Sequence, residues 1–251
     1  MPSIPPPDTW RWLLRLAGPP RVTMREAYAN AGGAGRFDHA ALDDLLRRVV
    51  DDEGLVDYAG LARYAGLLDG YLARIATAHF DGLTRNDKLA FLINAYNAAT
   101  LRLVLDHLPI ASIRDIPAKA RWKARRWTVG GRTMSLAEIE NAELRAKFAD
   151  PRIHFAINCA SLGCPKLRNA AFTGADIDAE LDAHTRDIHA DPRWLRCDAD
   201  GVRLTRIYRW YEDDFVQAAG SATDFALRYA PVIAGKPQRG WLPYDWALNA
   251  A

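Results

Sequence analysis

The amino-acid sequence predicts an α+β fold, a helix-rich single domain around a small antiparallel sheet. One long helical pattern, residues 88–107, is apolar on nearly every side, which is typical of a helix at the centre of a domain. Two short β-hairpin patterns follow it, at residues 127–134 and 194–206. Helical patterns come first along the chain, and short strands mixed with helices come later. This order favours the α+β class.

The composition of the chain is that of an ordinary globular protein, and it limits the expected partners. Of 251 residues, 49% are hydrophobic and 25% are charged, and the formal net charge is +2. This balance gives no reason to expect nucleic acid or an anionic membrane as a partner. A local basic cluster, residues 119–126, is interpreted as a solvated turn, with anion binding as the minor alternative. Three cysteines do not make a disulfide framework.

The start of the chain lacks the apolar run of a secretory signal. Arg11 and Arg15 interrupt its apolar residues. No stretch of about 18 apolar residues indicates a membrane span. We therefore expect a cytoplasmic protein without a membrane span.

The N-terminal part divides into an arm and the beginning of the main domain. Residues 1–36 are expected to form a helical arm, with a short helix at residues 9–17 behind a proline-rich start. Residues 37–251 are expected to form a single domain. Apolar residues at helical spacing predict a helix over residues 37–50, and a second helical pattern runs over residues 59–78.

The central helix begins at a capping box, Thr84-Arg-Asn-Asp87. Asn94 and Asn97 lie three residues apart on it and therefore share one face. A buried amide without partners costs roughly 1–3 kcal/mol, so each must bond to something specific. The two asparagines either line a functional site or hold a loop backbone in place.

The middle of the chain is predicted from its turn and cap residues. Gly130-Gly131 predicts a hairpin with a primed turn. A second capping box, Ser135-Leu-Ala-Glu138, predicts a helix to about Phe148 that carries Glu140.

A strand is predicted over residues 153–158, where Ile153, Phe155 and Ile157 alternate with other side chains. We place this strand in one sheet with the first hairpin, packed against the central helix. Later elements are helices at residues 177–188 and 210–218, a hairpin around Asp200-Gly201, and an extended aromatic tail.

The residues that point to chemistry gather in one stretch, RIHFAINCASLGCPKLR, residues 152–168. Cys159 or Cys164 is a candidate nucleophile, with His154 as the base that helps to form the reactive thiolate. On a regular strand His154 and Cys159 would point to opposite faces. Cys164, beyond the loop, returns toward His154 more easily. The alternative is that both thiols are small buried apolar side chains.

Two other kinds of site are weighed for the same cysteines. Cys159 and Cys164, with His184 and His189 downstream, resemble a two-Cys, two-His zinc layout, but the interval fits it poorly. His184 also falls on an apolar helical stripe. A redox pair is a minor option, because the spacing is not that of thioredoxin-like motifs. We therefore expect no metal and no cofactor.

Several blocks of the chain resemble, in order, the signature blocks of the domain-of-unknown-function family 547. They are DKLAFLINAYNAATLRLVL, MSLAEIENAELR, DPRIHFAINCASLGCPKLRNAAF, LTRIYRWYEDDF and PYDWALN. The resemblance covers about residues 40–248. The residues that match the family pattern are Asn94, Tyr96, Asn97, Glu140, His154, Cys159, Ser161, Cys164, Pro165, Trp210, Tyr211, Phe215, Asp245 and Trp246.

The resemblance implies that His154, Cys159 and Cys164 form one polar centre. Asn141 departs from the pattern, since the family usually has histidine there, which argues against an acid–base role at that position. His184 and His189 lie where the family does not require histidine, which weakens the zinc interpretation further.

The sequence therefore predicts a thiol-dependent hydrolase or acyl transferase. Cys159 or Cys164 would be the nucleophile, His154 the base, and Asn94 or Glu140 the orienting or polarising group. By fold-level analogy, the core would be similar to those of papain and transglutaminase enzymes. The substrate could be a small molecule or a peptide. The alternative is a non-catalytic binding or scaffold module in which the same residues hold the loop.

Overall fold

The fold is built around one buried helix. A computed structural model describes residues 19–30 and 32–251. Helix α5 (Arg85–Leu105) begins at Thr84, whose hydroxyl accepts the Asp87 backbone N–H at 3.1 Å. Nearly every residue from Asp87 to Val104 is buried. Helix α4 (Ala65–Thr77), helix α9 (Ile177–Ala190) and the π-helix η3 (Ile139–Arg145) pack around it. The predicted central helix is thus confirmed.

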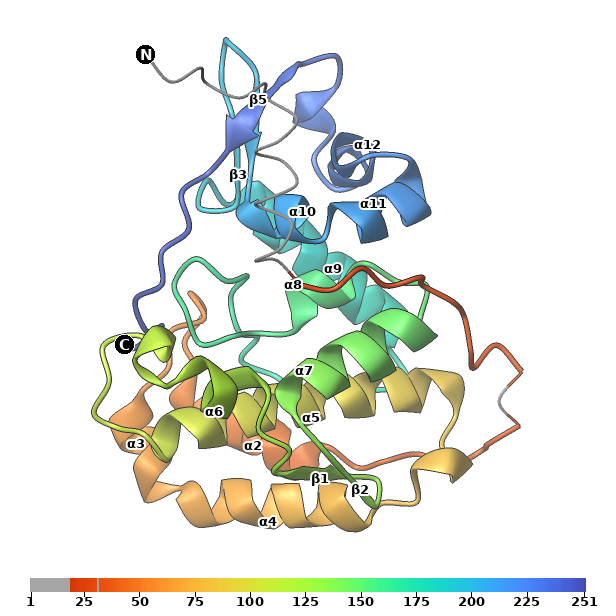
Figure 1. The fold of residues 1–251 in the computed structure, drawn as a ribbon, viewed down its shortest axis with the longest axis vertical. Coiled ribbons are helices and arrows are strands. Elements are labelled where there is room, and N and C mark those ends of the chain that lie inside the picture. The colour runs from red at the N-terminus through yellow and green to blue at the C-terminus, as the bar shows by residue number, and fades with distance from the viewer. Residues whose placement is uncertain (1–18, 31) are drawn as a thin grey trace, which may run out of the picture.

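The other helices are short and lie before and after α5 (Figure 1). The α-helices are α2 (Ala40–Val49), α3 (Tyr58–Arg63), α6 (Ala118–Trp122), α7 (Leu136–Glu138), α8 (Ile153–Ala156), α10 (Arg206–Trp210), α11 (Glu212–Ala219) and α12 (Ala222–Leu227). The 3₁₀ turns are η1 (Phe80–Gly82), η2 (Ile113–Asp115) and η4 (Pro231–Ile233).

Two small sheets complete the α+β fold. Strands β1 (Trp127–Val129) and β2 (Arg132–Met134) form the first hairpin, which packs on α4. Gly130 and Gly131 turn it with φ values of 56° and 77°, the left-handed conformation that a primed turn requires. Strands β3 (Leu195–Cys197) and β4 (Val202–Leu204) are antiparallel, and β5 (Gln238–Trp241) joins β4 in parallel. Both predicted hairpins are confirmed.

The strand predicted over residues 153–158 is wrong. Residues 153–156 form the one-turn helix α8, and only Ile157 then turns to extended backbone. The alternating pattern did not mark a strand with one buried face. Every side chain from Ile153 to Asn158 is buried, so neither face meets solvent. Consequently α5 packs among helices, and the expected sheet of residues 127–134 and 153–158 does not form.

Some predicted helices are interrupted. The pattern over residues 59–78 is divided into α3 and α4 at Tyr64, and that over residues 210–218 is broken at Tyr211, between α10 and α11. The helix that begins at Ser135 widens into η3. The break at Tyr211 matters, because it directs that side chain toward the site described below.

Helix α8 lies between two hydrophobic clusters. Ile153 and Ala156 belong to the larger cluster around α5, whereas Phe155 belongs to a smaller one formed with the C-terminal helices and β3–β4. Figure 1 shows α8 between the lower helical layer and the C-terminal part of the chain. The residues on α8 are therefore placed where the two clusters meet.

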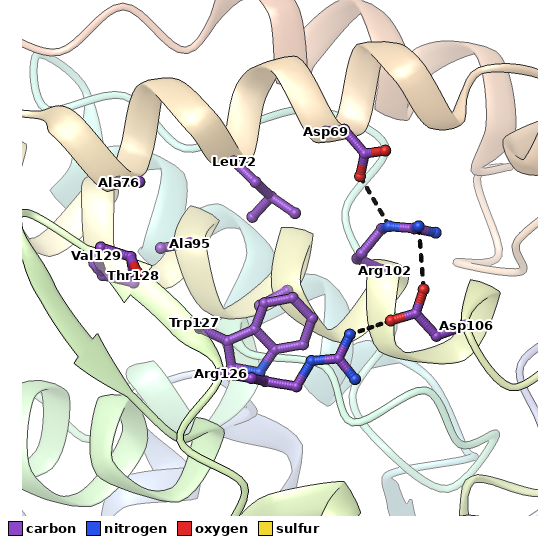
Figure 2. A pocket seen from close by; sticks show the side chains of 11 residues that line it. Asp69, Leu72, Ala76, Ala95, Arg102, Asp106, Arg126, Trp127, Thr128 and Val129 are labelled. Carbon is purple, nitrogen blue, oxygen red and sulfur yellow. Dashed lines mark hydrogen bonds and ion pairs between the residues drawn. The ribbon is translucent and has the colours of Figure 1, made fainter.

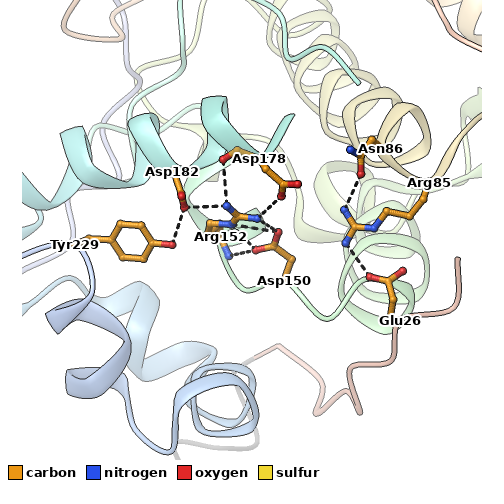
Figure 3. A network of polar contacts seen from close by, with 8 residues as sticks. All are labelled: Glu26, Arg85, Asn86, Asp150, Arg152, Asp178, Asp182 and Tyr229. Atoms are coloured by element: carbon orange, nitrogen blue, oxygen red, sulfur yellow. Dashed lines mark hydrogen bonds and ion pairs between the residues drawn. The ribbon is translucent and has the colours of Figure 1, made fainter. Parts of the chain in front are cut away.

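Arg152, just before α8, forms ion pairs with three aspartates where the two clusters meet (Figure 3). Its guanidinium binds Asp150 at 2.6 Å, and Asp178 and Asp182 of α9 at 2.8 Å each. Tyr229 donates to the same Asp182 at 3.0 Å. The network thus ties α8, α9 and the segment after α12 together.

The described part of the N-terminal segment runs along the domain. Glu26 pairs with Arg85 at 2.7 Å (Figure 3), and the Ala27 N–H donates to the Lys147 carbonyl at 2.9 Å. The helix predicted over residues 9–17 lies outside the described residues. In the part of the chain that the structure describes, none of the helices combines the length and apolar character needed to cross a bilayer.

Candidate active site

The loop after α8 carries two cysteines, and two asparagines hold it. On α5, the Asn97 side chain donates to the Ala156 carbonyl at 3.0 Å and accepts the Asn158 N–H at 2.9 Å. The Asn158 side chain donates to the Pro165 carbonyl at 2.8 Å and accepts the Ala160 N–H at 2.7 Å. Ala160 has a φ of 63°, a conformation that costs a non-glycine residue about 1–2 kcal/mol. The central helix therefore holds this loop in a tight turn.

Cys159 is half-buried at the start of that turn, among three hydrogen-bonding groups. Its sulfur lies 3.0 Å from the Ser161 hydroxyl and 3.1 Å from the Tyr244 hydroxyl, which are themselves 2.8 Å apart. Its backbone N–H donates to the buried Cys164 sulfur at 3.2 Å. The turn thus places the two sulfurs side by side with two hydroxyls.

These neighbours lower the pKa of the Cys159 thiol to about 7. The neighbouring Cys164 side chain contributes most, burial opposes the shift, and the hydroxyls of Ser161 and Tyr244 add to it. A large share of Cys159 is therefore thiolate at neutral pH, the form that attacks electrophiles. At Cys164, burial raises the pKa well above that of an ordinary thiol, so this sulfur keeps its proton.

His154 on α8 faces a buried carboxylate. Its Nε2 lies 2.8 Å from Oδ2 of Asp214 on α11, and Arg145 holds the same carboxylate through two bonds, of 2.7 and 2.9 Å. Burial lowers the pKa of His154, although the hydrogen bond to Asp214 opposes that shift. The imidazole is therefore neutral with its proton on Nε2, and its buried Nδ1 has no hydrogen-bond partner among the described residues.

Glu140 on η3 is linked to His154 through the side chain of Tyr211. The Tyr211 hydroxyl donates to Glu140 at 2.5 Å, and its ring stacks on His154 with a centroid separation of 3.9 Å. Asn94 lies elsewhere: its side chain donates to the Phe172 carbonyl at 2.8 Å and accepts the Phe172 N–H at 3.0 Å. Asn94 thus holds a loop backbone, one of the two roles expected for it.

A cavity of about 560 Å³ brings His154, Cys159, Cys164 and Glu140 together. Its remaining lining is mostly aromatic and apolar: Pro19, Pro20, Tyr96, Trp122, Lys123, Ala137, Asn141, Ile157, Ile207, Trp210, Tyr211, Tyr244 and Trp246. In the described chain no hydrogen bond joins His154 to either sulfur. His154 and Cys159 therefore line one cavity without a hydrogen bond between them.

The comparison with protein families concerns this same region. Residues 80–187 match the family model described as "Protein of unknown function, DUF547". The chain carries a DUF547 domain. The matched range runs from η1 into α9 and contains all five predicted site residues: Asn94, Glu140, His154, Cys159 and Cys164. No curated protein and no solved structure matches the chain.

Three residues that complete the site were not predicted: Arg145, Asp214 and Tyr244. Arg145 lies inside the DUF547 match, but Asp214 and Tyr244 follow it. Asp214 stands next to Asp213 and Glu212, and nothing in the sequence indicates which of the three carboxylates is buried. Tyr244 is one aromatic residue of an aromatic tail. Only the bond between its hydroxyl and the Cys159 sulfur gives it a role.

A second cavity, of about 360 Å³, lies between α4, α5 and β1 (Figure 2). Its charged groups are paired with one another. Arg102 binds Asp69 at 2.8 Å and Asp106 at 3.1 Å, and Arg126 also binds Asp106. Because these charges satisfy each other, this cavity offers less chemistry than the one that contains Cys159.

The two histidines weighed as zinc ligands are packed in the core. His189 bonds to the Thr185 carbonyl at 2.6 Å and to the Tyr208 hydroxyl at 2.5 Å, and His184 packs edge-on against Phe172. Among the residues that the structure describes, no group of three or more His, Cys, Asp or Glu side chains is arranged to hold a metal ion.

Proposed function

We propose that the chain is a thiol-dependent hydrolase or acyl transferase whose nucleophile is Cys159. The observation that carries the proposal is the Cys159 sulfur in the 560 Å³ cavity, bonded to Ser161 and Tyr244 and with its pKa lowered to about 7. An ordinary thiol has a pKa of about 8.5, so Cys159 carries more thiolate at neutral pH than an isolated cysteine. Cys164 stays protonated: its thiol donates to the Ile157 carbonyl at 3.8 Å, and its sulfur accepts the backbone N–H of Cys159.

The reaction would proceed through a thioester on Cys159. Its sulfur attacks the carbonyl carbon of the substrate, the S–C bond forms, and the bond from that carbon to the leaving group breaks. When Cys159 reacts from its thiol form, the thiol proton passes to Nδ1 of His154, through the bound substrate or one water, and then to the leaving group. When it reacts as the thiolate, the leaving group takes its proton from water. Water hydrolyses the thioester, or another nucleophile takes the acyl group, while Asp214 stabilises the imidazolium that forms.

The analogy with papain and transglutaminase enzymes concerns this chemistry. There, a thiol and an imidazole divide nucleophilic and proton-transfer work. Here, hydroxyl groups and a second thiol stabilise the thiolate, while His154, bonded to Asp214, lines the same cavity. We propose that Glu140, bound by Tyr211, keeps Tyr211 stacked on the imidazole and so positions His154.

Acyl-enzyme trapping tests the proposal. The native chain is treated with a neutral thioester of an aromatic acid, and acylation is located by peptide mass spectrometry. We expect the acyl group on Cys159. The Cys159→Ala variant should lose it, and His154→Gln should slow its release. Absence of any acyl group on Cys159 would contradict the proposal, provided that circular dichroism shows the chain to be folded.

A second candidate function is a non-catalytic binding module. The observation in its favour is that Asn97 and Asn158 use their side chains to hold the loop backbone, and that His154 bonds to Asp214 rather than to sulfur. In that case the thiols would be unreactive, and His154→Ala would cost stability without affecting any acylation. The same trapping experiment therefore separates the two functions.

A further inference from the structure

Two residues of the basic segment 119–126, Trp122 and Lys123, line the Cys159 cavity. We propose that the acyl donor accepted at Cys159 carries a negatively charged group, a carboxylate or a phosphate, and that Arg114, Lys119, Arg121 and Lys123 bind this group at the rim. This inference rests on the proposed function and adds the chemical class of its substrate.

The four cations are available, because none of them forms a salt bridge with a described carboxylate. Arg114, Lys119 and Lys123 are exposed, and Arg121 is half-buried. By contrast, the two arginines that follow are paired: Arg125 with Glu138 at 3.2 Å, and Arg126 with Asp106.

Two carboxylates near these cations, Asp115 and Asp245, accept hydrogen bonds from backbone N–H groups. The Asp115 side chain accepts the N–H groups of Ala111 and Ser112 at 2.9 and 3.0 Å, and Asp245 accepts the Ala247 N–H at 2.8 Å. Four cations against these two carboxylates leave an excess of positive charge here, which raises the local concentration of anionic ligands and their association rate.

The cations are also joined to the cavity wall. Lys123 and Trp122 line the cavity directly, and Lys119 stands one helical turn before Lys123. The Arg121 guanidinium lies 5.4 Å from the Trp122 ring centroid, and Arg114 lies 5.3 Å from that of Trp246, another lining residue. Arg121 holds the Ile113 carbonyl at 3.1 Å and has its buried Nε without a partner among the described residues.

The charge inside the cavity is opposite in sign to that of the cations at the rim. This difference sets the orientation in which an anionic substrate binds. The interior groups are the Cys159 thiolate, the carboxylate Glu140 and the neutral His154. An anionic group is repelled from this interior and attracted to the rim. The aromatic wall between the two regions suits an apolar acyl chain or ring. The substrate would therefore enter with its acyl end toward Cys159 and its anionic end toward Lys123.

Two matched thioesters test this inference: S-benzoyl thioglycolate, which carries a carboxylate, and its uncharged carboxamide. Their dissociation constants are measured with the Cys159→Ala variant by quenching of tryptophan fluorescence, so that no turnover intervenes. At an ionic strength of about 0.01 M we expect the anionic thioester to bind about tenfold more tightly. The difference should vanish at about 1 M, where charges are screened within about 3 Å.

Charge reversal identifies the residues responsible. Lys119→Glu combined with Lys123→Glu, added to Cys159→Ala, should weaken binding of the anionic thioester about tenfold and leave that of the neutral one within about twofold. Arg125→Ala is the control, since this neighbouring cation is paired with Glu138. Equal affinity for both thioesters, or equal effects of the double reversal and Arg125→Ala, would overturn the inference. The proposed function is tested separately. If neither thioester leaves an acyl group on Cys159 of the native chain, the proposed function is wrong.

Discussion

Asp214 is a buried residue that determines the tautomer of His154. Its carboxylate is fully buried and has two partners, the Arg145 guanidinium and the His154 imidazole. Burial tends to raise the pKa of Asp214, but the bonds from His154 and Arg145 outweigh it and lower the pKa, so the group is ionised at neutral pH. An ionised Asp214 accepts the Nε2 proton of His154 and thereby selects the tautomer whose Nδ1 is free to take a proton.

Replacing this carboxylate should therefore be costly. Asp214→Asn leaves the Arg145 charge buried without an anion, and we expect the free energy of unfolding to fall by about 3–5 kcal/mol. The neighbouring Asp213→Asn is the control. Asp213 pairs with Arg21, and their side chains are 42% and 68% exposed, so the loss should stay below about 1 kcal/mol. Urea denaturation of both variants measures this, and similar losses would contradict the assigned role of Asp214.

At the scale of elements, α5 organises the chain through two asparagines with the same geometry. Asn94 and Asn97 each use the side-chain amide to bind one backbone carbonyl and one backbone N–H at 2.8–3.0 Å. Asn94 binds both groups of Phe172, before α9. Asn97 binds Ala156 and Asn158, on either side of the bend that leads to Cys159. One helix therefore anchors two loops, only one of which is part of the site.

Because the two asparagines make the same kinds of hydrogen bond, their alanine variants form a matched pair. Asn94→Ala and Asn97→Ala should each reduce the free energy of unfolding by roughly 2–4 kcal/mol, because each leaves two buried backbone groups without partners. Only Asn97→Ala should slow the alkylation of Cys159, since only Asn97 holds that loop. Denaturation and thiol-labelling rates are measured on the same samples. Equal labelling rates in the two variants would mean that Asn97 does not position Cys159.

At the scale of the whole molecule, several histidines are buried as neutral groups. Burial lowers the pKa of His39, His184 and His189 to about 4 each, and it lowers that of His154 as well. An unfolded histidine titrates near 6.5. As the pH falls from about 6.5 toward about 4, the unfolded chain binds protons that the folded chain does not. Stability is therefore complete above about pH 6.5 and declines below it.

The free energy of unfolding should decline steeply as the pH falls, and each buried histidine should contribute to that decline. Every such group contributes about 1.4 kcal/mol of lost stability per pH unit in this window. His184→Leu removes one of them at a position whose Nε2 has no partner among the described residues, so the decline should become less steep by about that amount. Denaturant unfolding at about pH 7 and about pH 5 measures both chains. An unchanged slope in the variant would contradict the account.

The sequence predicts local features of this molecule better than long-range ones. The start of α5, both hairpins and the loop that carries the cysteines follow from caps, turns and periodicity, which are local. Residues 153–158 could not be predicted in this way, because their burial on all sides depends on two clusters that lie far apart in sequence. The partners of His154 and Cys159, Asp214 and Tyr244, are 60 and 85 residues away. The pairing of these groups is a property of the fold.

The reactivity of Cys159 is the central claim, and the pH dependence of its alkylation tests it most directly. Iodoacetamide labelling of all three thiols is followed by peptide mass spectrometry, with Cys197 as the internal reference. We predict a half-maximal rate for Cys159 near pH 7, a shift to higher pH in Tyr244→Phe, and slow labelling of buried Cys164. Labelling of Cys159 no faster than that of Cys197 at neutral pH would contradict the claim.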